Sequence, residues 1–378
     1  MAGIYLHIPF CKQLCYYCGF HKSISLKDKD LMLTCLHKEL EMRCDYLEGE
    51  LVETIYFGGG TPSVYKPDQI EALIDHIRML FPVDTQVEIT LEANPDDLNQ
   101  SYLQALEKGS VNRLSIGVQS FHRDDLKLMN RRHTGEEAIE AIKRAQRCGF
   151  DNISVDQIYG VPGLTMEKWS RNLEILFDLG IQHISSYHLM FDPETVFSHK
   201  LKKGQIKEID EELSLAQFKM LIHKARSHGF LHYEISNFCL KGYHSRHNTS
   251  YWQQKKYLGV GPSAHSYNLR QREWNVSHNQ KYINSIENGM IPSQIELLSV
   301  NDQFNDYVLT SMRTMWGLDL LYVKKNFGEK YYQFCLNEAN KYIRSSHVRI
   351  EKDCVIISDK GVFVSDDIMS DFFWVEDQ

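Results

Sequence analysis

The sequence predicts an α/β protein, with a parallel sheet and intervening helices over the first half of the chain and a small α+β region at the end. Short runs rich in β-branched and aromatic residues alternate strictly with helical patterns as far as Tyr187, and beyond Tyr187 this alternation stops. Strands joined by helices long enough for right-handed crossovers form a parallel sheet, which is either doubly wound or curled toward a barrel.

The first half contains the elements of six strand–helix units. Six segments have the composition of strands, at residues 4–7, 54–57, 86–91, 113–117, 152–158 and 183–187. Helical patterns lie between them, at residues 28–47, 67–80, 99–107, 135–148 and 166–179. Several of these helices begin at Asp, Asn or Pro, and some end at Gly149 or Gly180, which are typical start and stop signals.

The second half has a different organisation. A long amphipathic helix is predicted near residues 210–228, followed by a polar stretch rich in His and aromatic residues at 232–252 and a glycine-rich loop at 259–262. From about residue 292 the pattern is one of helices followed by short strands, which we expect at 348–350, 354–357 and 362–364.

Composition and charge exclude several classes of function. A net charge of −8, with no basic run or basic helix, argues against nucleic acid as the main partner. No apolar stretch approaches the roughly 20 residues of a spanning helix, and the first residues show no charged leader, so we expect a cytoplasmic protein. Six of the nine cysteines are scattered singly, so a disulfide framework is not expected.

The other three cysteines, Cys11, Cys15 and Cys18, lie together in the loop after the first strand. Three thiolates can hold a cuboidal four-iron cluster and leave one iron open for another ligand. The competing interpretation is a structural zinc site, because His21 would complete a set of three cysteines and one histidine.

Polar and glycine residues occur where successive predicted strands end. Gly58, Gly59, Gly60 and Thr61 follow the second strand, and three further positions lie at or near the ends of the third, fourth and fifth strands: Glu92, Gln119 and Asp156. In parallel α/β folds the ligand lies at the carboxyl ends of the strands. The sequence therefore predicts one ligand site that the cysteine loop shares with these residues.

The spacing Cys-x3-Cys-x-aromatic-Cys at Cys11, Cys15 and Cys18 resembles the signature of the radical S-adenosylmethionine (radical SAM) superfamily. The string from Tyr5 to Cys11 is similar to the branch that contains the oxygen-independent coproporphyrinogen III oxidases (dehydrogenases) and the HemW-type heme chaperones. The resemblance implies a partial (β/α)6 parallel barrel of radical SAM type, a [4Fe-4S] cluster on the three cysteines, and S-adenosylmethionine as a source of a 5′-deoxyadenosyl radical.

The resemblance also implies site residues and domains. S-adenosylmethionine would be bound by nine residues, and no catalytic residue is assigned beyond the cluster ligands: Tyr5, Tyr17, Gly59, Gly60, Thr61, Glu92, Gln119, Arg131 and Asp156. Arg131 would be expected on a solvated helix end if the resemblance were absent. The expected units are the barrel at 1–230, a heme-motif and barrel-closing segment at 231–290, and a small C-terminal α+β domain at 291–378.

Three features favour a heme chaperone over the alternative, an oxygen-independent coproporphyrinogen III oxidase in porphyrin biosynthesis. Phe20 stands where those enzymes carry a further cysteine, and only ten residues precede Cys11. The chaperone branch carries a His-Asn-x-x-Tyr-Trp motif, which occurs here as His247, Asn248, Tyr251 and Trp252. Whether the chain is itself an enzyme depends on which of these two functions it has.

The motif predicts a heme site, because imidazole is a common axial ligand of heme iron and Tyr and Trp offer flat apolar faces. His247 is the expected ligand, with alternatives at His232, His244 and His265, and the competing interpretation is a buried aromatic corner. The expected partners are heme or a related tetrapyrrole, a reductant protein and heme-acceptor proteins, together with peripheral membrane contact and a homodimer.

Overall fold

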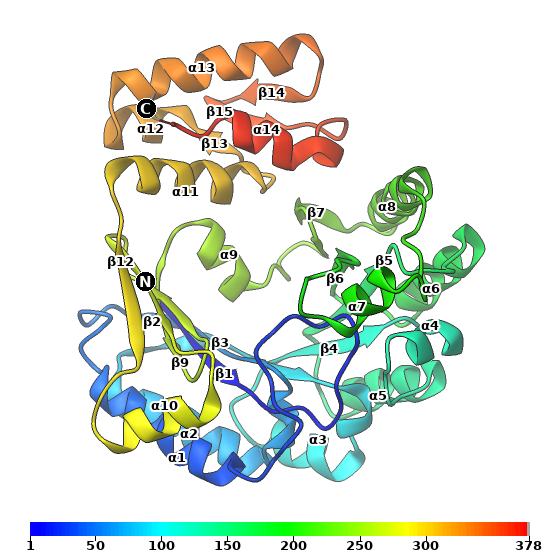
Figure 1. The fold of residues 1–378 in the computed structure, drawn as a ribbon, viewed down its shortest axis with the longest axis vertical. Coiled ribbons are helices and arrows are strands. Elements are labelled where there is room, and N and C mark those ends of the chain that lie inside the picture. The colour runs from blue at the N-terminus through cyan, green and yellow to red at the C-terminus, as the bar shows by residue number, and fades with distance from the viewer. Residues whose placement is uncertain (376–378) are drawn as a thin grey trace.

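A computed structural model describes residues 1–375 of the chain, and the predicted fold class is confirmed. One 12-stranded sheet runs through the larger part of the molecule in the order β12-β11-β10-β9-β1-β2-β3-β4-β5-β6-β8-β7 (Figure 1). Its centre consists of the six predicted strands, which pair in parallel: β1 (Ala2–Ile8), β2 (Val52–Gly59), β3 (Val83–Ala93), β4 (Arg113–Gln119), β5 (Ile153–Tyr159) and β6 (His183–His188).

Helices connect these six strands as predicted. They are α1 (Lys29–Met42), α2 (Pro67–Leu80), α3 (Gln100–Glu107), α5 (Gly135–Arg147) and α6 (Met166–Asp178), with short additional elements at η1 (Pro62–Val64), η2 (Pro95–Asp97) and α4 (Arg123–Leu128). The first helix ends at Met42 and not at Leu47, because Arg43 leaves the helical conformation and its guanidinium pairs with Glu273 at 2.6 Å.

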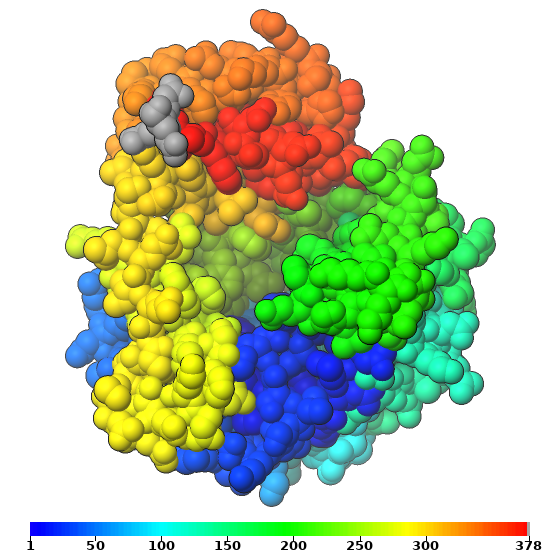
Figure 2. Space-filling view, viewed as in Figure 1, coloured from blue at the N-terminus to red at the C-terminus, as the bar shows by residue number. Residues whose placement is uncertain are grey.

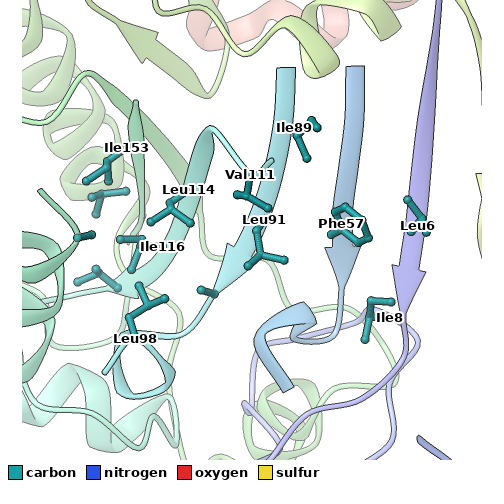
Figure 3. Packing of buried hydrophobic residues seen from close by; sticks show 14 of the residues in the cluster. Leu6, Ile8, Phe57, Ile89, Leu91, Leu98, Val111, Leu114, Ile116 and Ile153 are labelled. Atoms are coloured by element: carbon teal, nitrogen blue, oxygen red, sulfur yellow. The ribbon is translucent and has the colours of Figure 1, made fainter. Parts of the chain in front are cut away.

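The alternation of side chains along each strand separates the core from the site. Leu6, Phe57, Leu91 and Ile116 are fully buried, and Figure 3 shows such residues of neighbouring strands packed together in one apolar cluster. Because successive side chains of a strand point to opposite faces, the residues between them face the other side of the sheet. That side carries Tyr5, Tyr56, Glu92 and Ser115, and it is the concave interior of the partial barrel.

Residues 231–297 add strands to both edges of the sheet. On one side β9 (Lys256–Val260) pairs in parallel with β1, and three antiparallel strands follow: β10 (His265–Tyr267), β11 (Gln271–Asn275) and β12 (Ser293–Leu297). On the other side are β8 (Asn237–Cys239) and β7 (Leu231–Glu234). The helices between β6 and β12 are α7 (Val196–Lys202), α8 (Glu211–Ser227), α9 (Arg246–Trp252) and α10 (Asn279–Glu287).

The C-terminal region has an apolar cluster of its own and lies above the larger sheet in Figure 1. It contains α11 (Val300–Met312), α12 (Leu320–Asn326), α13 (Glu329–Arg344), α14 (Ser365–Asp371) and a small sheet of β13 (Leu318–Asp319), β15 (Cys354–Ile357) and β14 (Val348–Glu351). The strand expected at 362–364 is wrong: Val362–Val364 is a 3-10 turn, η3, because the Val362 amide donates to Ser358 and the Val364 amide to Gly361. The proposed domain boundaries near 230 and 290 stay a prediction.

The space-filling view shows a recess in this face of the molecule, with the C-terminal region above it and the segment around α7 at its side (Figure 2). Within residues 1–375, no helix combines the length and the apolar character that crossing a membrane requires.

Candidate functional site

A cavity of about 540 Å³ lies at the carboxyl ends of the parallel strands. A volume of this size suits a cofactor-sized ligand. Most of the predicted site residues line it together: Cys11, Cys15, Tyr17, Cys18, Gly59, Gly60, Thr61, Glu92, Gln119, Arg131 and Asp156. Tyr5 lies deeper, where its ring stacks on Tyr56 with centroids 6.1 Å apart.

The glycine loop is shaped by its contact with the cysteine loop. A Cβ on Gly60 would lie 2.7 Å from the Phe10 carbonyl oxygen and 3.0 Å from Cys11 Sγ, and Gly59 has a φ of +110°. A side chain at either position would therefore push the two loops apart or strain the backbone. The glycines keep backbone next to the cysteine sulfurs, which leaves room for a ligand.

Two cysteine sulfurs accept hydrogen bonds from residues that are themselves connected. Thr61 Oγ1 donates to Cys11 Sγ at 3.4 Å, and Arg131 Nη1 donates to Cys15 Sγ at 3.2 Å. Asn94 joins the two donors, because its Nδ2 donates to Thr61 Oγ1 at 3.2 Å and its Oδ1 accepts from Arg131 Nη2 at 2.5 Å. Asn94 was not among the predicted site residues, since an Asn before Pro95 has the sequence signature of an ordinary turn.

Two carboxyl groups face the same cavity. Tyr56 donates to Glu92 Oε1 at 2.8 Å, and Ser115 donates to Asp156 Oδ1 at 3.2 Å. Burial raises the pKa of Glu92 to about 7 and that of Asp156 to about 6. These hydrogen bonds and the charge of Arg113 offset the cost of burying the two carboxylates only in part, so the site favours a ligand that carries positive charge.

The raised pKa of Glu92 predicts a pH dependence of the ligand-free protein. Between its ordinary value of 4.5 and about pH 7, the folded state keeps a proton on Glu92 that the unfolded state has released. Stability must therefore fall as the pH rises through this window. We expect Glu92→Gln to flatten the slope of the melting temperature between pH 5 and about 7.5. If the melting temperatures of wild type and variant changed with pH in parallel, the pKa of Glu92 would not be raised in the folded protein.

His21, the fourth ligand of the zinc alternative, is engaged elsewhere. Its Nε2 lies 2.7 Å from Asn279 Oδ1 on α10, and it is not among the residues that line the cavity. Across residues 1–375, no three His, Cys, Asp or Glu side chains surround a point as the ligands of one metal ion do. With His21 engaged by Asn279, the donor set at the cysteine loop is three thiolates, which suits a cuboidal cluster that binds each thiolate through a different iron.

His247 lies inside the barrel, on the short helix α9 that packs against β1 and β2. Its Nδ1 is 2.8 Å from Thr54 Oγ1, its Nε2 is 2.7 Å from the Tyr251 hydroxyl, and the side chain is buried. Burial lowers its pKa to about 3, so the ring is neutral. An axial ligand must offer a free nitrogen to an open face, and in this conformation His247 offers none.

The other residues of the motif are also involved in packing. The guanidinium of Arg313 lies over the Trp252 ring at 4.2 Å, which ties α9 to the C-terminal region. The rings of His247 and Tyr56 stack at 4.9 Å, and Tyr56 in turn holds Glu92. The motif thus supports the floor of the cavity, through contacts that the sequence pattern does not reveal. Asn248 is half-buried at the start of the same helix.

Three cysteines in a loop after the first strand of a partial parallel barrel, beside a glycine loop and strand-end carboxylates, define the class of radical SAM proteins. A family model described as the Radical SAM superfamily matches residues 5–195. The family implies a [4Fe-4S] cluster and S-adenosylmethionine, and the geometry of the cavity fits both.

Two curated relatives show which family of radical SAM proteins this chain resembles over most of its length. The chain is 35% identical over 334 residues to the heme chaperone HemW of Bacillus subtilis, covering 88% of this chain and 87% of the relative. It is 30% identical over 369 residues to the heme chaperone HemW of Lactococcus lactis, covering 97% and 96%. The chain therefore belongs to the radical SAM superfamily and, within it, to the HemW family, as its resemblance predicted.

A solved structure shares the fold over nearly the whole chain. Coproporphyrinogen III oxidase (HemN) from Escherichia coli superposes with a TM-score of 0.85 at 22% identity, covering 98% of this chain and 90% of that one. At this identity the likeness shows the fold alone.

The position of Asn94 predicts that its replacement changes the midpoint potential of the cluster and leaves the assembly of the cluster intact. Asn94→Leu removes both hydrogen bonds to Thr61 and Arg131 while keeping the size of the side chain. We expect normal iron content and a midpoint potential lowered by roughly 50 mV, because hydrogen bonds to sulfur stabilise the reduced, more negative cluster. A redox titration followed by electron paramagnetic resonance measures this shift. An unchanged potential, with the exposed control Asn288→Leu also unchanged, would contradict the role of Asn94.

Proposed function

We propose that this chain is a heme chaperone, which binds heme and passes it to acceptor proteins. The observation that carries the proposal is its 30% identity to a heme chaperone HemW over 97% of this chain and 96% of that relative. A reductant protein, peripheral membrane contact, a homodimer and a cytoplasmic location belong to the same proposal.

The cavity supports the assignment of roles to individual residues. Cys11, Cys15 and Cys18 would hold the cluster, and the half-buried backbone of Gly59 and Gly60 beside Thr61 would receive the methionine part of the cofactor. The other proposed contacts of S-adenosylmethionine are Tyr5, Tyr17, Glu92, Gln119, Arg131 and Asp156. When bound, the cluster supplies single electrons, and S-adenosylmethionine supplies a cleavable carbon–sulfur bond.

The second candidate is a coproporphyrinogen III oxidase, and the fold shared with the Escherichia coli enzyme supports it. Phe20 counts against it. This side chain is 72% exposed at the cavity, at the position where those enzymes carry a further cysteine. An apolar ring there offers contact area for a ligand and no thiol for chemistry.

Heme binding and release test the proposal. The anaerobically reconstituted protein is titrated with heme, and we expect saturation near one heme per chain with a Soret band. The loaded protein is then mixed with apomyoglobin as a heme-accepting probe, and heme should move to the probe. A featureless, non-saturating titration, or heme that never leaves, would contradict the chaperone assignment.

A further inference from the structure

The mouth of the cavity lies between two loops. One is the end of the cysteine loop, residues 19–22, and the other consists of the last two residues of β6 and the segment after it, residues 187–192. The loops approach closely, because a Cβ on Gly19 would lie 2.5 Å from Asp192 Oδ2. Residues of both loops line the cavity, so the two loops form its outer rim.

Large apolar side chains on this rim are exposed to solvent. Phe20 is 72%, Met190 67% and Tyr187 45% exposed, and all three line the cavity. Single exposed apolar residues are common, but three of them around one cavity mark a docking surface. Phe20 and Tyr187 offer aromatic faces and Met190 an adaptable one, which suits a flat apolar ligand.

The same rim carries two side chains of the types that bind heme iron. His188 is exposed, and its ring packs over Gly160, where a Cβ would lie 2.5 Å from Nε2. Met190, two residues later, presents a thioether. Imidazole and thioether are the axial ligands of many heme proteins. His188 and Met190 are exposed and line the cavity, whereas His247 is buried with both ring nitrogens engaged.

Charge at the rim fits the acidic edge of heme. Lys22 lines the cavity, and its ammonium donates to the Cys18 carbonyl at 2.5 Å and to the Phe20 carbonyl at 3.1 Å. An ammonium held at this place can pair with a propionate. The single rim carboxylate, Asp192, lies across the mouth against Gly19.

We propose that heme docks across this mouth, with its ring on Phe20, Tyr187 and Met190, its iron facing the side chains of His188 and Met190, and a propionate on Lys22. This inference rests on the proposed function, since it assigns that function a site. It has a second consequence: bound heme covers the entrance to the cavity that holds S-adenosylmethionine, so heme and the cofactor control each other's exchange.

Heme titrations of reconstituted protein test the site. The variants are Phe20→Ser and the double variant His188→Ala/Met190→Ala. His223→Ala and Met79→Ala are the controls, because His223 on α8 and Met79 on α2 are exposed away from the cavity. We expect the double variant to lose at least about tenfold in heme affinity and to shift the Soret band. Iron–sulfur absorbance should stay, because the cysteines are untouched. The single variants His188→Ala and Met190→Ala then show which of the two side chains binds the iron.

The release rate of labelled S-adenosylmethionine provides an independent readout. We expect heme to slow release from the wild-type protein and to have little effect in the double variant. If wild-type protein binds heme while the double variant and Phe20→Ser bind it equally well, the rim is not the site, although the proposed function stands. If wild-type protein binds no heme, the proposed function itself fails.

Discussion

Replacing Cys11, Cys15 and Cys18 together by Ala should reduce the iron content from about four atoms per chain to none and abolish the brown colour of the reconstituted protein. The three sulfurs line one cavity, and burial raises the pKa of the Cys11 thiol to about 11. A thiol this buried ionises only when it gains a cationic partner, and an iron centre is such a partner. The triple variant should therefore lose all of its cluster iron and not only part of it.

Iron and labile sulfide analysis, with absorbance near 400 nm, measures this effect. Cys148→Ala is the matched control, because Cys148 lies outside the cavity and is half-buried. Iron retained by the triple variant, or one zinc per chain in the wild type, would show that the cysteine loop does not hold the cluster.

Replacing His247 by Ala should destabilise the protein strongly and leave its heme spectrum unchanged. The substitution leaves Thr54 Oγ1 and the Tyr251 hydroxyl without their partner and opens a hole under Tyr56. Each unpaired buried group costs about 1–3 kcal/mol, so we expect the melting temperature to fall by roughly 5–10 °C. Binding of S-adenosylmethionine should also weaken, because Tyr56 positions Glu92.

Calorimetry of wild type, His247→Ala and His247→Gln measures this effect, and Gln should restore part of the stability because its amide can replace one hydrogen bond. His265→Ala is the control, since His265 is exposed on β10. A variant with wild-type stability but no Soret band would contradict the interior role and return His247 to the position of axial ligand.

The central fold and most of the proposed site could be predicted from the sequence because they depend on local signals. The alternation of strands and helices, Cys11, Cys15 and Cys18 in one loop, and Glu92 at a strand end follow from spacing alone, since the carboxyl ends of parallel strands meet at one edge. The edge strands β7 to β12 were missed, because runs of three to five residues carry little periodic signal.

Residues whose role depends on distant partners could not be found in this way. The position of His247 depends on Thr54, almost two hundred residues away, and on Gly3, where a Cβ would lie 3.3 Å from the imidazole. The role of Asn94 depends on Arg131 and Thr61. The exposed rim at Phe20 and Met190 becomes visible only when the loops are placed together.

The most direct test of the chaperone assignment is a turnover assay with the alternative substrate. Anaerobically reconstituted protein is incubated with coproporphyrinogen III, S-adenosylmethionine and a reductant, and protoporphyrinogen is measured over time, with an active coproporphyrinogen oxidase as positive control. We predict no conversion above the cluster-free triple variant, although the same preparation binds about one heme per chain. Steady formation of protoporphyrinogen at about one turnover per minute or faster would contradict the account and make this protein an enzyme of porphyrin synthesis.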